Sequence, residues 1–290
     1  MTRRRRWWVR LAAVVLVLTG IALTPGCNSV FYQPDAQRYR PLPAGGEDVW
    51  FASRDGTRLH GWFLPAQGKA KGTVVHVHGN AQNLTSHVGF VDWLPAQGFS
   101  VFAFDYRGYG ESAGSPSRGG VVEDTRAALD YVRSRADVDA TRVVVFGQSL
   151  GGAIATAALG EGGTNGVCGF AVDSTFGSYI HMGNAALGGT FLTYPLAWLL
   201  LSDDHAPEHS IGKIAPVPIL FLHGTQDPVV PLAEGRRLFA AAGEPKTFVE
   251  LSEPGHTVAT YTAEGRAQLV LFFERCFAND GVPAAPRETR

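Results

Sequence analysis

The chain has 290 residues, of which 45% are hydrophobic and 18% are charged, and its formal net charge is −1. This apolar content is enough for a folded core and excludes a largely disordered chain. The near-zero net charge gives no electrostatic reason to expect binding to nucleic acid. Three cysteines without a C-x-x-C spacing support neither a disulfide framework nor a zinc site.

The N-terminus has the pattern of an export signal or membrane anchor over residues 1–27. Arg3–Arg6 precede an uncharged apolar run over 11–23, which is the layout of a secretory signal. The run is shorter than the roughly 20 residues of a transmembrane helix. Cys27 follows Gly26 and resembles the acylated cysteine of bacterial lipoproteins. We predict an exported, membrane-attached protein, with lipidation at Cys27, an uncleaved anchor, and cleavage with release as the alternatives.

Residues 28–46 are rich in proline and glycine and predict a linker, and residues 279–290 predict a flexible tail. The domain between them, 47–278, opens with two apolar runs around Asp55-Gly56, which predict an antiparallel hairpin. Dense apolar runs predict further strands at 73–78, 100–105, 142–146, 169–172, 217–222 and 246–251. Because most of them do not alternate, we expect strands that are buried on both faces of a parallel sheet.

Helical spacing of apolar residues is found between these strands, at 121–135, 152–159, 231–242 and 257–277. The sequence therefore predicts an α/β fold with a mostly parallel central sheet, an antiparallel opening hairpin and helices on both faces. A segment over about 176–214 breaks the alternation, and its run over 187–201 is too apolar for an exposed loop. We predict an inserted helical lid there. Its apolar character favours an acyl substrate, although membrane contact or core packing would produce the same pattern.

The candidate nucleophile is Ser149 in Gly147-Gln-Ser-Leu-Gly151. This pattern follows a predicted strand and precedes a helix of small residues, which is the setting of a nucleophile elbow. The turn is strained, so its flanking positions need glycine, and the strain exposes the serine hydroxyl above the sheet. A serine hydroxyl becomes an effective nucleophile only when a neighbouring base takes its proton.

The candidate base is His256, in a turn between the last predicted strand and the last predicted helix. A loop at that point returns to the sheet edge that carries Ser149, and the order serine, acid, histidine is the order of this fold. The other histidines after Ser149 lie at a strand end or in the predicted lid, at His223, His181, His205 and His209.

The candidate acid is Asp227, which follows the strand over 217–222 at the same sheet edge. Its role would be to orient the imidazole and stabilise its charged form. Asp173, which ends the preceding strand, is the alternative. Asp203 and Asp204 are interpreted as a helix cap or a solvated face.

Two backbone N–H groups are candidates for stabilising the oxyanion, those of Leu150 and Asn80. Leu150 follows the nucleophile, and Asn80 lies in the loop after the strand over 73–78. We expect the Asn83 side chain to form hydrogen bonds within that loop. The glycine-rich stretch over 105–112 lacks the spacing and lysine of a phosphate loop and is interpreted as a wall of the site.

Five motifs together resemble a known family, the Bem46-like α/β-hydrolases that are often labelled serine aminopeptidase S33. They are His78-Gly-Asn-Ala, Asp105-Tyr-Arg-Gly-Tyr-Gly, Gly147-Gln-Ser-Leu-Gly-Gly152, His223-Gly-Thr-Gln-Asp227 and Gly255-His256. The resemblance covers roughly residues 45–278. It implies the α/β-hydrolase fold and a triad of Ser149, Asp227 and His256.

The sequence thus predicts an exported serine hydrolase acting on esters or thioesters, with a small-molecule or lipid-like acyl substrate. No metal or organic cofactor is expected, and the membrane is the other partner. A peptidase or amidase of the S33 type is the enzymatic alternative. A non-catalytic binding module is the alternative from a different class.

Overall fold

A computed structural model of the protein describes residues 30–278. The predicted signal or anchor over 1–27, including Cys27, and the predicted tail over 279–290 lie outside the described residues. Within residues 30–278, no helix has both the length and the apolar character needed to cross a membrane.

The centre of the domain is one eight-stranded sheet with the order β1-β2-β4-β3-β5-β6-β7-β8. The predicted opening hairpin consists of β1 (Glu47–Ala52) and β2 (Arg58–Leu64), which pair antiparallel, and β2 is also antiparallel to β4. All other neighbours pair parallel, through β3 (Gly72–Val77), β4 (Phe99–Phe104), β5 (Val143–Gln148), β6 (Val167–Asp173), β7 (Ile219–Gln226) and β8 (Lys246–Pro254). The predicted mostly parallel sheet is confirmed.

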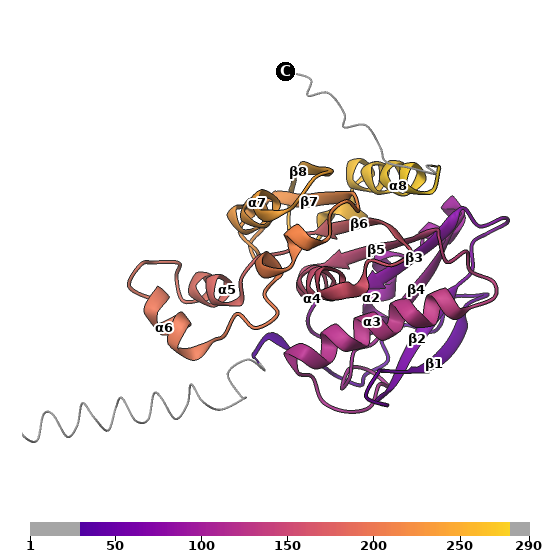
Figure 1. The fold of residues 1–290 in the computed structure, drawn as a ribbon, viewed down its shortest axis with the longest axis horizontal. Coiled ribbons are helices and arrows are strands. Elements are labelled where there is room, and N and C mark those ends of the chain that lie inside the picture. The colour runs from indigo at the N-terminus through magenta and orange to yellow at the C-terminus, as the bar shows by residue number, and fades with distance from the viewer. Residues whose placement is uncertain (1–29, 279–290) are drawn as a thin grey trace, which may run out of the picture.

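Helices cover both faces of this sheet (Figure 1). Strand β3 shows why its sequence is continuously apolar: Val75 contributes to the core on one face, and Val74 contributes to the core on the other. The first core includes side chains of α3 (Arg118–Ser134), α4 (Leu150–Ala158) and α7 (Leu232–Ala241). The second includes side chains of α2 (Leu84–His87) and α8 (Ala263–Ala278).

The predicted insertion between β6 and β7 contains two short helices, α5 (Tyr179–Ala186) and α6 (Tyr194–Leu200). They form a hairpin that projects from one end of the molecule (Figure 1). Asp203 caps α5, because its carboxylate accepts hydrogen bonds from Ser178 Oγ (2.8 Å) and the backbone N–H of Tyr179 (2.7 Å). The expected capping role of Asp203 is therefore observed, whereas the role of the hairpin as a lid stays a prediction.

The segment predicted to be a linker is docked on the domain from residue 30 onward. Tyr32 is buried, and the backbone N–H of Gln33 donates to Asn80 Oδ1 (2.9 Å). Asn83 Nδ2 donates to the backbone oxygen of Gln37 (2.8 Å), and the N–H of Tyr39 donates to Thr85 Oγ1 (2.9 Å). We call residues 30–40 the N-terminal strap, since they lie across the loop that follows β3.

Candidate active site

Ser149 occupies a strained turn between β5 and α4. Its backbone has φ +52° and ψ −122°, a conformation that non-glycine residues rarely adopt. A Cβ at Gly147 would lie 2.6 Å from Gly152 Cα, and one at Gly151 would collide with the carbonyl oxygens of Val77 and His78. The glycines on both sides of the pattern are therefore required by close backbone contact, as the sequence predicted.

Asp227 and His256 are hydrogen-bonded to each other. Nδ1 of His256 lies 2.8 Å from Oδ2 of Asp227, whose side chain is fully covered from solvent, while that of His256 is 20% exposed. Because a carboxylate only accepts, Nδ1 carries the proton, which leaves Nε2 of the neutral ring free to accept one. Val229 and Val230 donate their backbone N–H groups to Oδ1 of Asp227 (2.8 and 2.9 Å).

These bonds also determine the charge of Asp227. Burial by itself would raise its pKa, but the hydrogen bond from His256 and the two backbone donors outweigh burial and hold the pKa below its usual value. Asp227 is therefore ionised at neutral pH and ready to orient the imidazole.

Asp173, the alternative acid, has different partners. Its Oδ2 lies 3.3 Å from Gln148 Nε2 and 3.3 Å from the backbone N of Ala259, and its Oδ1 lies 3.2 Å from Ser174 Oγ. Complete burial raises the pKa of Asp173 to about 7. The Asp173 side chain thus connects Gln148 to the loop that contains Ala259. The carboxylate that is hydrogen-bonded to the His256 imidazole is that of Asp227.

Three of the four other histidines after Ser149 have identified partners, and one of them, His223, also lies 3.7 Å from Oδ2 of Asp227 through its Nε2. His223 is buried and its Nε2 donates to the backbone oxygen of Val230 (2.9 Å). His205 pairs with Glu161 (2.8 Å), and His181 of α5 contacts Arg237 of α7. Of the histidines weighed as the base, only His256 lines the cavity that contains Ser149.

The loop after β3 contributes Asn80 to that same cavity. Three groups donate to its Oδ1: the backbone N–H of Ala81 (2.7 Å) and of Gln33 (2.9 Å), and the Tyr109 hydroxyl (3.1 Å). These contacts fix the position of the residue whose N–H was predicted as an oxyanion donor. Leu150, the other predicted donor, begins α4. Its N–H therefore has no acceptor within the helix and can donate to a bound group.

Asn83 and the stretch over 105–112 both form hydrogen bonds to the segment that follows β3. Asn83 caps α2, accepting from the N–H of Thr85 (3.0 Å), and also bonds the strap, so its side chain makes loop hydrogen bonds as expected. In the stretch over 105–112, the hydroxyl of Tyr106 donates to the backbone oxygen of His78 (2.6 Å). That stretch supports the loop beside Ser149, in keeping with a structural wall.

The cavity at Ser149 has a volume of about 230 Å³. The sequence did not single out several of its lining residues, which are His87, Phe90, Gln148, Val229 and Thr257. Burial lowers the pKa of His87 to about 3, so this second imidazole is neutral at pH 7 and a weak base. No sequence pattern marked it, because it lies in a short helix far from the triad in chain order. No residue of the α5–α6 insertion lines this cavity in the described structure.

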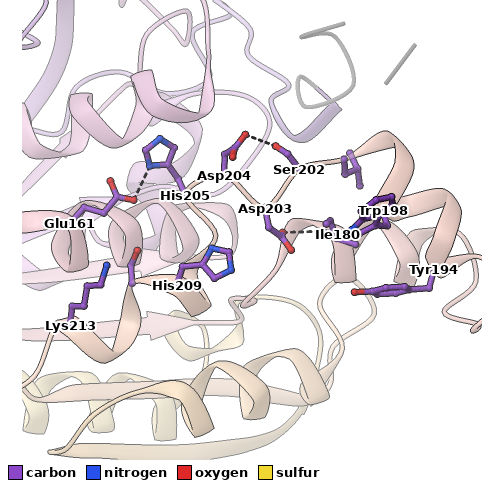
Figure 2. Close-up of a pocket in the computed structure, with 12 residues that line it drawn as sticks. Glu161, Ile180, Tyr194, Trp198, Ser202, Asp203, Asp204, His205, His209 and Lys213 are labelled. Carbon is purple, nitrogen blue, oxygen red and sulfur yellow. Dashed lines mark hydrogen bonds and ion pairs between the residues drawn. The ribbon is translucent and has the colours of Figure 1, made fainter. Parts of the chain in front are cut away.

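A larger groove of about 1010 Å³ lies beside the insertion (Figure 2). Glu161, His205 and Lys213 line one side, and Tyr194 and Trp198 of α6 line the other. Glu161 follows the C-terminal end of α4, whereas Ser149 precedes its N-terminal end. The groove is thus separate from the serine and from the Asp227–His256 pair, so size alone does not identify the reactive site.

Comparisons with known proteins identify the family of this chain. Residues 68–183 match the serine aminopeptidase S33 family of hydrolases. The uncharacterised protein YfhR of Salmonella typhi is 43% identical, over 87% of this chain and 89% of its own length. The α/β-hydrolase domain-containing protein WAV2 of Arabidopsis thaliana is 37% identical over 72% of each chain, and protein bem46 of Schizosaccharomyces pombe is 30% identical over 69% and 67%.

Among solved structures, an esterase of Pyrococcus furiosus superposes with a TM-score of 0.69. It is 19% identical in sequence, and the match covers 84% of this chain and 97% of the esterase, so it supports the fold. The sheet order, the strained turn at Ser149 and the similar proteins lead to one assignment. The chain belongs to the Bem46-like group of the α/β-hydrolase superfamily and is an enzyme of the hydrolase class.

Proposed function

We propose that this hydrolase cleaves carboxylic esters or thioesters through Ser149, His256 and Asp227. The observation that carries the proposal is the cavity shared by Ser149 and His256, with Nδ1 of His256 bonded to the covered carboxylate of Asp227 (2.8 Å). This arrangement supplies a nucleophile on a strained turn, a base with a free Nε2, and an ionised group that orients the base.

In the proposed reaction, Ser149 Oγ attacks the acyl carbon while His256 Nε2 takes the hydroxyl proton. His256 then gives that proton to the leaving alcohol or thiol, whose bond to the acyl carbon breaks. Water attacks the resulting acyl-serine while His256 takes a proton from it. The bond between the acyl carbon and Ser149 Oγ then breaks, the carboxylic acid leaves, and His256 returns the proton to Ser149. The backbone N–H groups of Asn80 and Leu150 are the proposed donors to the oxyanion in both steps.

The size of the cavity favours a short acyl group. A volume of about 230 Å³ is below the range of about 300–1,000 Å³ that is common for drug-sized ligands. Phe90 and Val229 supply apolar lining beside Ser149, as a short acyl chain requires. We therefore expect kcat/KM to be highest for acyl chains of about two to six carbons, and to fall for longer ones.

A peptidase or amidase of the S33 type is the second candidate, favoured by the matched family. An aminopeptidase needs a negative group that binds the free amine of its substrate. None of the described residues that line the Ser149 cavity is Asp or Glu. We therefore prefer an ester or thioester. Turnover of aminoacyl nitroanilides with a higher kcat/KM than that of nitrophenyl esters would reverse this preference.

We also propose that the protein is exported and attached to a membrane through residues 1–27. The support is the sequence pattern of Arg3–Arg6 followed by the uncharged run over 11–23. Metabolic labelling with a radioactive fatty acid tests lipidation, since incorporation is expected to disappear in Cys27→Ser. Incorporation that is unchanged in this variant would exclude Cys27 as the site.

The decisive experiment for the reaction is labelling of the full chain with a fluorophosphonate probe. We expect covalent labelling of the wild type and none of Ser149→Ala, since only an activated serine reacts. Ser134→Ala is the matched control, because this serine is exposed at the end of α3 and should leave labelling unchanged. A folded wild type that is not labelled would instead indicate a non-catalytic binding module.

A further inference from the structure

The α5–α6 hairpin carries an apolar surface that neither the core nor the proposed reaction uses. Within residues 30–278, ten large apolar side chains are exposed, and half of them fall within residues 187–198. They are between 40% and 84% exposed, and we call them the apolar ridge: Leu187, Phe191, Leu192, Leu196 and Trp198. Exposed apolar side chains that are scattered singly need no explanation, but a contiguous group of this kind marks an interaction surface.

One member of the ridge, Trp198, also borders the groove described above, and the ridge as a whole lies on a packed hairpin. Ala197 of α6 is buried, and a Cβ at Gly183 of α5 would collide with the Leu201 side chain, so the two helices are in close contact. At the base, Asp203 accepts a hydrogen bond from the N–H of Tyr179 (2.7 Å). Because the inner side of the hairpin is already occupied, the ridge cannot be covered by closing α5 onto α6.

The charge pattern indicates what covers the ridge. Residues 182–202 contain no Asp, Glu, Lys, Arg or His. Protein interfaces usually have a polar rim, whereas the hydrocarbon of a bilayer penalises every charged side chain. Trp198 and Tyr194 have the amphipathic rings that are enriched at the boundary between lipid and water. An uncharged tip with such rings fits a lipid surface better than it fits a soluble partner.

The path of the described chain brings the start of the strap to the base of the hairpin. Phe31 of the strap packs against Tyr179 of α5, with 5.0 Å between ring centroids, so the chain reaches the domain at the base of the hairpin. Position 23, the end of the uncharged run, and Val30 are seven residue steps apart. Fully extended, these steps span at most about 25 Å. If residues 11–23 lie in a bilayer, the base of the hairpin is therefore held within about that distance of it.

We propose that the apolar ridge inserts into the surface of a lipid bilayer and forms a second membrane contact beside the N-terminal segment. The hairpin projects from the end of the molecule at which the strap begins (Figure 1). Two contacts fix the orientation of the domain, whereas a single tether would let it rotate. This inference builds on the proposed membrane attachment and is independent of the hydrolytic reaction.

The test uses the full chain in vesicles of phosphatidylethanolamine and phosphatidylglycerol whose acyl chains carry bromine, which quenches nearby tryptophans. We expect the quenched part of the fluorescence to fall by at least about a third in Trp198→Phe, since the membrane-facing indoles would be Trp198 and, where residues 1–27 are retained, also Trp7 and Trp8. Trp50→Phe is the matched control, because Trp50 is 37% exposed on β1 and outside the ridge. Fluorophosphonate labelling of each variant reports separately on the folded active site.

A second variant, Phe191→Ser with Leu192→Ser, keeps Trp198 but removes the two most exposed apolar side chains of the ridge. We expect the part of the bromine quenching that depends on Trp198 to fall at least twofold in this variant. The proposal is overturned if Trp198→Phe changes the bromine quenching no more than Trp50→Phe does. If Trp198 is not quenched by bromine but is shielded from iodide only at a high ratio of protein to lipid, the ridge is covered by a second copy of the chain. Shielding at every such ratio without bromine quenching would assign it to residues 11–23.

Discussion

Replacing Asp227 by asparagine tests the proposed triad most sharply, because the hydrogen bonds determine which way the amide turns. Oδ1 of Asp227 accepts two backbone N–H groups, from Val229 and Val230, and Oδ2 accepts from Nδ1 of His256. The single carbonyl oxygen of asparagine keeps the two backbone bonds only at the Oδ1 position. Its NH₂ group then faces Nδ1, which must accept, so the ring proton moves to Nε2.

An imidazole protonated at Nε2 cannot take the proton of Ser149. We therefore expect kcat for p-nitrophenyl acetate to fall about 10⁴-fold in Asp227→Asn, the loss that a wrong tautomer causes in a serine triad. Asp173→Asn is the matched control. Its Oδ1 partner is the Ser174 hydroxyl, which can both donate and accept, so the amide is accommodated and kcat should change less than about tenfold, or roughly 1.4 kcal/mol.

The measurement is steady-state hydrolysis at pH 7.5, with thermal melting to show that both variants are folded. If Asp173→Asn loses as much activity as Asp227→Asn, the acid has been assigned wrongly. If Asp227→Asn keeps activity within tenfold of wild type, His256 does not depend on this carboxylate and the proposed mechanism fails.

Three further predictions concern the turn at Ser149, the buried carboxyl and the strap. Gly151→Ala should reduce kcat about 100-fold by displacing the turn, since its Cβ would collide with the Val77 oxygen. Gly177→Ala, whose Cβ would meet nothing closer than 3.6 Å, should leave kcat within twofold, and equal losses in the two variants would contradict the steric argument. Asp173 has a folded pKa of about 7, above its unfolded value near 3.8, so the folded state binds the proton more tightly and loses stability as pH rises from about 4 to 7. Asp173→Asn should therefore raise the melting temperature at pH 8 relative to wild type but not at pH 4, and an equal change at both would refute the assignment. Asn83→Ala, which removes the α2 cap and the bonds to the strap, should lower the free energy of unfolding by about 2 kcal/mol, and urea titration with no shift in midpoint would exclude this role.

The central sheet could be predicted because its strands are buried on both faces. Runs such as 73–78 and 142–146 consist mainly of β-branched residues without regular alternation, which favours a place in the sheet interior. The turn at Ser149 was equally readable, since glycine is the only residue that allows the backbone to approach as closely as it does at Gly151.

The strap and the insertion could not be predicted in the same way. The strap looks like a linker because it lies in the proline- and glycine-rich stretch over 28–46. It is held by side-chain amides that are distant in the sequence, as in the bond from Gln33 to Asn80. A sequence pattern indicates backbone pairing within strands or helices, so hydrogen bonds to distant side chains are not visible in it. For the segment over about 176–214, the sequence predicted helices, and α5 and α6 are found there. Apolar character could not tell whether these helices cover the Ser149 cavity, and in the structure they do not line it.

The docking of the strap affects where this enzyme can be shortened. The region that matches the serine aminopeptidase S33 family begins at residue 68, so a protein trimmed to it would lack the opening hairpin and every contact from residues 30–40. Asn80 would lose the backbone donor of Gln33, and the loop beside Ser149 would be free to change its conformation. Signal cleavage before Cys27 would leave the strap intact. The smallest active enzyme should therefore start near residue 30, and a clone that begins after residue 40 should give a folded but poorly active product.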